Sequence, residues 1–143
     1  MPLIKFDIFE GRSNQQIRVM LDAAHRAMLA AFKVPQRDRY QIVNEHHASR
    51  MIVEDTGLGI ERTDKVVVVT VISRPRSEQE KTFFYAELCR ELKISCGIEE
   101  SDVVVSFVNN TDADWSFGNG RAQFLTGELG GGACQRAKPN PSQ

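Results

Sequence analysis

The feature that most constrains the fold is an internal repeat at a shift of 64 positions. The shift places predicted strand on strand and predicted helix on helix, and four identical residues coincide: Arg12, Ser13, Gln15 and Asp38 fall on Arg76, Ser77, Gln79 and Asp102. A repeat at one fixed offset indicates architecture more strongly than any single propensity. It predicts two βαβ-like halves, about residues 2–62 and 66–129.

The first half starts with a short apolar-rich strand over residues 2–9. Ser13 and Gln16 form a capping box, and apolar residues then recur at helical spacing to about Phe32. Pro35 cannot continue that helix, so it ends there. A second strand follows at about residues 40–44.

The second half repeats this order. Residues 65–73 are almost wholly β-branched and apolar, which predicts a central strand buried on both faces. Ser77 and Glu80 form another capping box, and the helix that they open ends near Gly97. Residues 103–108 supply the last strand.

These elements predict an α/β (α+β) fold in which a tandem βαβ repeat forms a four-stranded sheet with two helices on one face. The opposite face would be apolar and need a partner, so we expect an oligomer. Residues 1–129 are expected to form a single domain. The stretch 130–143 contains three consecutive glycines and few apolar residues, which predicts a disordered tail.

Composition excludes several classes of protein. The formal net charge is -1, which provides no field to attract nucleic acid or an anionic membrane. The chain shows neither a signal peptide nor a membrane-spanning run, and we expect a cytoplasmic protein. The three cysteines, Cys89, Cys96 and Cys134, show no zinc spacing with histidine, so neither a metal nor a cofactor is expected.

Three features of the first 76 residues could carry chemistry. Removal of Met1 would expose the secondary amine of Pro2 at the head of a strand, where neighbouring groups could set its protonation. Arg74 and Arg76 follow a strand end, where ligands of α/β folds commonly bind, and guanidinium groups match a carboxylate. Asp38 is also a candidate. Taken singly, Pro2 could be an uninformative start, Arg74 and Arg76 a solvated surface pair, and Asp38 a turn residue.

Past residue 109 the sequence becomes polar and glycine-rich but carries the only tryptophan. Four apolar side chains could line a pocket or simply pack in a core or interface: Trp115, Phe117, Phe124 and Leu129. A loop tryptophan favours one of these two environments over solvent.

Taken together, these features resemble the tautomerase superfamily, and within it the malonate semialdehyde decarboxylases. The resemblance covers about residues 2–129 and rests on these runs: Pro-Leu-Ile-Lys-Phe-Asp at residues 2–7, Asp-Arg-Tyr-Gln at 38–41, Glu-Asp-Thr-Gly-Leu-Gly at 54–59, Ser-Arg-Pro-Arg-Ser at 73–77, Asp-Ala-Asp-Trp-Ser-Phe-Gly at 112–118 and Phe-Leu-Thr-Gly at 124–127. The run through Trp115 and Phe117 is the most specific of them.

The resemblance implies a homotrimer that acts on a small carboxylate substrate, converting malonate semialdehyde to acetaldehyde and carbon dioxide. It implies that Pro2, Asp38, Arg74 and Arg76 are catalytic. It further implies that the substrate is bound by the arginine pair and by a hydrophobic wall of Trp115, Phe117, Phe124 and Leu129. Hydratase, dehalogenase or keto-enol tautomerase activity, and a cytokine-like binding role, remain as alternatives.

Overall fold

The computed structural model describes residues 2–129. The chain forms two compact units, the first ending at Asn109 and the second beginning at Asn110, and each is described by itself. Met1, the predicted tail at 130–143 and Cys134 lie outside the described residues. The single-domain organisation stays a prediction.

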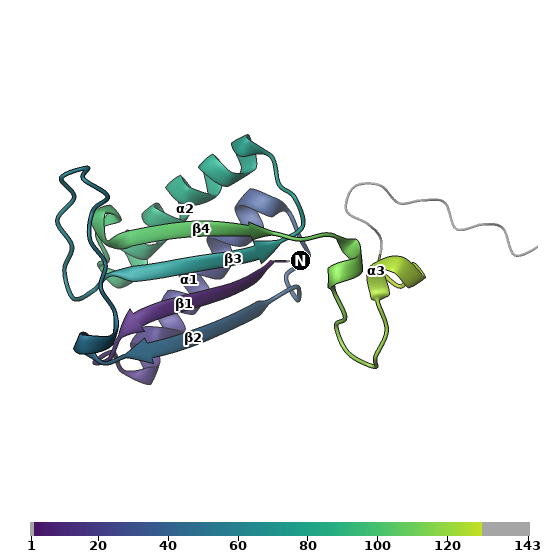
Figure 1. The fold of residues 1–143 in the computed structure, drawn as a ribbon, viewed down its shortest axis with the longest axis horizontal. Coiled ribbons are helices and arrows are strands. Elements are labelled where there is room, and N and C mark those ends of the chain that lie inside the picture. The colour runs from purple at the N-terminus through teal and green to yellow at the C-terminus, as the bar shows by residue number, and fades with distance from the viewer. Residues whose placement is uncertain (1, 130–143) are drawn as a thin grey trace, which may run out of the picture. The chain divides into compact units, whose positions relative to one another are not determined.

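The first unit is built on a four-stranded mixed sheet (Figure 1). Its strands are β1 (Leu3–Phe9), β2 (Tyr40–His46), β3 (Val67–Ser73) and β4 (Val103–Asn109), in the order β2-β1-β3-β4. The pairs β1/β2 and β3/β4 are parallel, and the central pair β1/β3 is antiparallel. The predicted tandem βαβ sheet is confirmed.

Two helices of equal length connect the strands of each half, α1 (Asn14–Phe32) and α2 (Glu78–Cys96). Both predicted capping boxes are present, at Ser13 and at Ser77. Gly97 ends α2 in the left-handed conformation, with φ of 65°, which glycine adopts without a steric penalty. The short helices η1 (Ala48–Arg50) and η2 (Glu100–Asp102) precede β3 and β4 respectively.

The repeat inferred from the sequence is present in the structure at the same shift. Leu3 and Phe9 bound β1, and the residues 64 positions later, Val67 and Ser73, bound β3. The bounds of α1 and α2 are related by the same shift. An element at one end of the sheet therefore has a counterpart at the other end.

The core lies between the sheet and the helices, which cover one face of it (Figure 1). Alternate residues of the two central strands are fully buried there: Ile4, Phe6 and Ile8 of β1, and Val67, Val69 and Val71 of β3. Between the helices, the rings of Phe32 and Phe84 stack with centroids 5.2 Å apart.

The expectation that β3 is buried on both faces is wrong within a single chain. Val68, Thr70 and Ile72 point to the open face and are only half-buried, because both helices pack on the other side. Tyr40 and Ile42 of β2 are exposed by 41% and 44% on this open face. The strand therefore has an apolar second face that no part of the first unit covers.

The second unit contains two short elements, η3 (Asp112–Asp114) and α3 (Gln123–Thr126). Asp114 accepts hydrogen bonds from both the backbone N–H and the hydroxyl of Thr111, which closes the turn at η3. Within residues 2–129, none of the helices has the length and apolar character that a membrane crossing requires.

Candidate functional site

Strand register gathers three of the sequence-predicted regions at one end of the sheet. Leu3 pairs with Tyr40 of β2 and with Ile72 of β3. Pro2, one residue earlier and buried, is therefore flanked by the segment that leads into β2 and by the segment that leaves β3. The first of these segments carries Asp38, and the second carries Arg74 and Arg76.

Asp38 is held in a turn between α1 and β2. Its backbone N–H donates to the carbonyl of Pro35 at 2.9 Å, and only 7% of the residue is exposed. The Nε2 of His25 on α1 lies 2.9 Å from the carbonyl of Gln36 and ties the same turn to the helix. These two contacts fix the turn from which the Asp38 side chain extends.

Arg76 is positioned by neighbours on three elements. Its Nε donates to Oγ of the fully buried Ser73 at 3.2 Å, and Cζ lies 4.9 Å from the centroid of the Phe32 ring. A carboxylate oxygen of Glu80 is 3.9 Å from Nη1. Within residues 2–129, no group accepts a hydrogen bond from the buried Nη2 of Arg76.

The charges that act on Arg76 include those of the other candidate residues, Arg74 and Asp38. Burial lowers the pKa of Arg76 from its ordinary value, the charge of Glu80 raises it, Arg74 lowers it and Asp38 raises it. The two arginines and the aspartate are therefore near enough to act on one another. A second cation and a buried donor favour an anionic ligand at this end of the sheet.

The predicted hydrophobic wall belongs to the second unit and forms an aromatic cluster there. Trp115 and Phe117 stack with centroids 5.3 Å apart and an interplanar angle of 11°. Phe124 meets Phe117 edge to face at 5.4 Å. The N–H of Leu129 donates to the carbonyl of Gln123 at 3.2 Å, so Leu129 follows the same short helix.

Sequence reasoning missed three residues that hold these side chains. Ser73 and Phe32 support Arg76, and Gln123 supports the aromatic cluster. Gln123 accepts from the N–H of Phe117 at 2.9 Å and donates to the carbonyl of Gly118 at 2.7 Å. A polar residue closing an apolar strand could have indicated Ser73, whereas the role of Gln123 depends on a turn that no local pattern predicts.

Comparison with known proteins assigns the family. One family model described as tautomerase enzyme matches residues 38–118, and a second with the same description matches residues 2–61. "Probable tautomerase YrdN" of Bacillus subtilis (strain 168) is 53% identical over 129 residues, covering 90% of this chain and 100% of the relative. The chain belongs to the tautomerase enzyme family.

Solved structures give a narrower similarity. A malonate semialdehyde decarboxylase whose decarboxylase and hydratase activities were analysed structurally is 57% identical, with a TM-score of 0.88, covering 89% of this chain and 98% of that one. Another malonate semialdehyde decarboxylase, inhibited by 3-bromopropiolate, is 39% identical, with a TM-score of 0.85 and coverages of 89% and 97%.

Proposed function

We propose that the protein decarboxylates malonate semialdehyde (3-oxopropanoate) to acetaldehyde and carbon dioxide. The observation that carries the proposal is the buried Nη2 of Arg76, which has no acceptor among residues 2–129 and lies at the sheet end where Pro2 precedes β1. A substrate carboxylate would satisfy this donor, because guanidinium and carboxylate groups match in both charge and planar geometry. The two solved decarboxylases support the choice of substrate.

The substrate is a β-oxo acid, which defines what the site must do. Breaking the bond to the carboxylate releases carbon dioxide and leaves an electron pair that the aldehyde carbonyl accepts as an enolate. Stabilising that oxygen lowers the barrier. Pro2, freed by removal of Met1, either donates a proton to the oxygen or condenses with the aldehyde to an iminium that accepts the electron pair.

The arginine pair binds and orients the carboxylate in this proposal. Arg74 and Arg76 hold the scissile bond perpendicular to the carbonyl plane, where orbital overlap favours cleavage. Asp38 orients an arginine or the proline ammonium, or positions a water. The aromatic wall of Trp115, Phe117, Phe124 and Leu129 accommodates the neutral carbon dioxide as charge leaves the carboxylate.

The proposed assembly is a homotrimer formed through the open face of the sheet. Tyr40, Ile42 and Val108 leave 41%, 44% and 49% of their surfaces exposed on that face. A fused 4-OT protein of the same fold, 21% identical with a TM-score of 0.71, was solved as a symmetric trimer. An apolar sheet face of this kind is commonly covered by another subunit.

A second candidate is another reaction at the same site, namely hydration or dehalogenation of a small unsaturated acid, or keto-enol tautomerisation. It is favoured by the relative named as a tautomerase and by the hydratase activity of the 57% identical protein. A cytokine-like binding role is less favoured, because it gives no reason for a buried guanidinium with an unsatisfied donor.

The direct test is to assay the purified protein for acetaldehyde released from malonate semialdehyde. We expect turnover in the native chain, and a fall in kcat/KM of about 100-fold or more in Arg76→Gln, since a charged contact and its orienting effect are both lost. Arg37→Gln, at an exposed position of the turn before β2, is the matched control and should keep native turnover. Absence of acetaldehyde with conversion of an unsaturated acid instead would move the function to the second candidate.

A further inference from the structure

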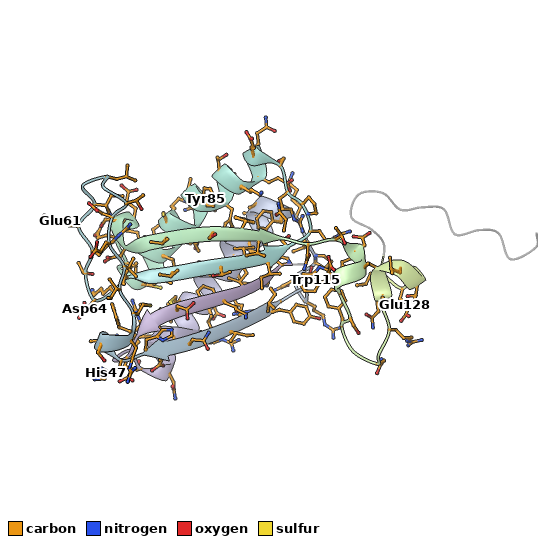
Figure 2. All side chains as sticks on the ribbon, viewed as in Figure 1. His47, Glu61, Asp64, Tyr85, Trp115 and Glu128 are labelled. Atoms are coloured by element: carbon orange, nitrogen blue, oxygen red, sulfur yellow. The ribbon has the colours of Figure 1, made fainter. Side chains whose placement is uncertain are left out.

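A cavity of about 460 Å³ lies at the end of the sheet away from Pro2. Figure 2 shows Asp64, one of its lining residues, at that far end. The cavity lies between the start of α1 and the end of α2. Its lining combines an arginine, a thiol and apolar side chains with charged residues at the rim: Arg12, Cys96, Met20, Ile98, Glu10, Asp64 and Lys65.

The internal repeat relates this cavity to the candidate active site. A shift of 64 positions carries Arg12 onto Arg76 and Glu10 onto Arg74, and it carries Pro2 onto Val66. The far site therefore keeps one arginine but has neither the proline nitrogen nor a counterpart of Arg74, whose place is taken by Glu10. It retains the means to bind an anion while it lacks the groups proposed for the chemistry.

A second difference between the two halves adds open space at the far site. Phe32, whose ring lies 4.9 Å from Cζ of Arg76, corresponds to Cys96 under the same shift. The cysteine side chain is much smaller than a phenyl ring, so its position leaves space beside Arg12. The smaller side chain at this position contributes to the open volume of the cavity.

The guanidinium of Arg12 has N–H groups that a ligand in this cavity could use. Its Nη2 donates to the carbonyl of Lys65 at 2.7 Å, and the side chain is half-buried. Across residues 2–129, no carboxylate comes within ion-pair distance of Arg12. Asp102, the counterpart of Asp38, acts on Arg12 through its charge, but it accepts its hydrogen bonds from the backbone N–H and the hydroxyl of Thr63.

The other residues that line the cavity determine what ligand it can hold besides an anionic group. Met20 and Ile98 are each 1% exposed and give the cavity an apolar floor. Glu10 and Asp64 are exposed at the rim and would repel a second negative charge, while Lys65 adds one positive charge there. This combination suits a ligand with a single anionic group and a short aliphatic body.

We propose that this cavity is a second binding site, which takes a small aliphatic monocarboxylate with its carboxylate on Arg12 and its hydrocarbon chain against Met20 and Ile98. The proposal does not depend on the reaction catalysed at Pro2.

Cys96 provides a reporter inside the cavity. Its thiolate displaces iodide from iodoacetate or from iodoacetamide, forming a C–S bond as the C–I bond breaks. Because the thiolate fraction is the same for both reagents, the ratio of the two rates depends on how the site treats a carboxylate. Cys89, half-buried on the same helix, lines a separate cavity whose two cations are paired with carboxylates, Arg90 with Glu87 and Lys93 with Glu99, and it is the internal control.

We expect the iodoacetate to iodoacetamide rate ratio at Cys96, measured by peptide mass spectrometry on the full chain, to exceed that at Cys89 by about 5-fold or more. This is a conservative conversion of a charged hydrogen bond at a partly exposed site. Butyrate should protect Cys96 from iodoacetamide, whereas neutral butyramide should not. Equal ratios at the two cysteines, together with no protection by butyrate, would overturn the proposal.

Two substitutions of Arg12 test whether this residue, and not a neighbour, causes the preference for iodoacetate at Cys96. Arg12→Gln should reduce the ratio at Cys96 to that of Cys89, and Arg12→Lys should retain part of the preference. Arg26→Gln is the matched control, because Arg26 also influences the Cys96 thiol but is held by Glu91 and Ser95. A preference that survives Arg12→Gln, or that disappears only in Arg26→Gln, contradicts the proposal. If Arg12→Gln fails to fold, the native comparison of the two cysteines and the butyrate protection still decide the question.

Discussion

The guanidinium of Arg76 lies over the ring of Phe32, with Cζ 4.9 Å from the ring centroid. Phe32 is the last residue of α1, and Arg76 directly precedes the cap of α2, so the contact joins the end of one helix to the start of the other. The ring restricts the guanidinium on one side while Ser73 holds its Nε on another. A rigid guanidinium loses less entropy when it binds a carboxylate.

The first prediction concerns Ser73, whose Oγ accepts from Arg76 Nε at 3.2 Å and donates to the Arg74 carbonyl at 2.9 Å. Ser73→Ala removes both bonds and leaves the guanidinium less well held. We expect kcat/KM for malonate semialdehyde to fall by about 10-fold, since a buried hydrogen bond is worth roughly 1–3 kcal/mol. Steady-state kinetics measure the fall.

Ser49→Ala, at an exposed site in η1, should leave the same kinetics unchanged. Circular dichroism and thermal unfolding should show that Ser73→Ala remains folded. Native kcat/KM in a folded Ser73→Ala protein would mean that Arg76 needs no support from β3.

The second prediction concerns the protonation state of Pro2. If Pro2 is a general acid, activity should stay level through neutral pH and fall when alkali removes its proton, and Pro2→Ala should lack that limb. Activity that rises as Pro2 loses its proton indicates the neutral amine, as base or as iminium former. A pH–rate profile with borohydride trapping separates these cases. A rise with no trapped adduct would contradict both decarboxylase mechanisms.

Gln123 gives the third prediction, within the second unit. Gln123→Leu keeps a similar volume but removes the bonds to the Phe117 N–H and the Gly118 carbonyl. We expect the aromatic cluster to lose its fixed geometry, with a change in the fluorescence of Trp115, the only tryptophan, and about a 10-fold fall in kcat/KM. Gln79→Leu, exposed on α2, is the control. Native fluorescence and activity in Gln123→Leu would exclude this supporting role.

The sequence predicted the sheet and its helices because the signals for them are local and repeated. The capping boxes at Ser13 and Ser77, and the β-branched run of β3, are each readable within a few residues. The sequence overstated the burial of β3. An apolar strand covered by helices on both faces has the same composition as one with helices on one face and an apolar surface on the other.

The candidate site was predictable only in part, for a related reason. Pro2, Asp38 and Arg76 carry unusual chemistry, so their residue types stand out. Ser73 and Phe32 act by position, at a strand end and at a helix end that meet only in the folded chain. Their roles depend on contacts between distant segments, which neither propensity nor spacing encodes.

The last prediction concerns His25, which is 5% exposed and supports the turn that carries Asp38. Burial is the largest influence and lowers the pKa of His25 below its ordinary value of 6.5, although the Gln36 carbonyl opposes this. The folded state therefore binds this proton less readily than the unfolded state does. The stability that depends on neutral His25 is fully present above about pH 6.5 and is lost as the pH falls below it.

His25→Gln retains a donor for the Gln36 carbonyl but cannot titrate. We expect the free energy of unfolding of this variant, measured in urea at fixed protein concentration, to decline less between pH 7 and pH 5 than that of the native chain. The two slopes should differ by at most about 1.4 kcal/mol per pH unit, the limit for one proton. His47→Gln, at an exposed position, should keep the native slope. A buried neutral histidine must take up its proton on unfolding, so replacing His25 should change the slope. If the native and His25→Gln proteins lose stability equally as the pH falls, another group governs that loss.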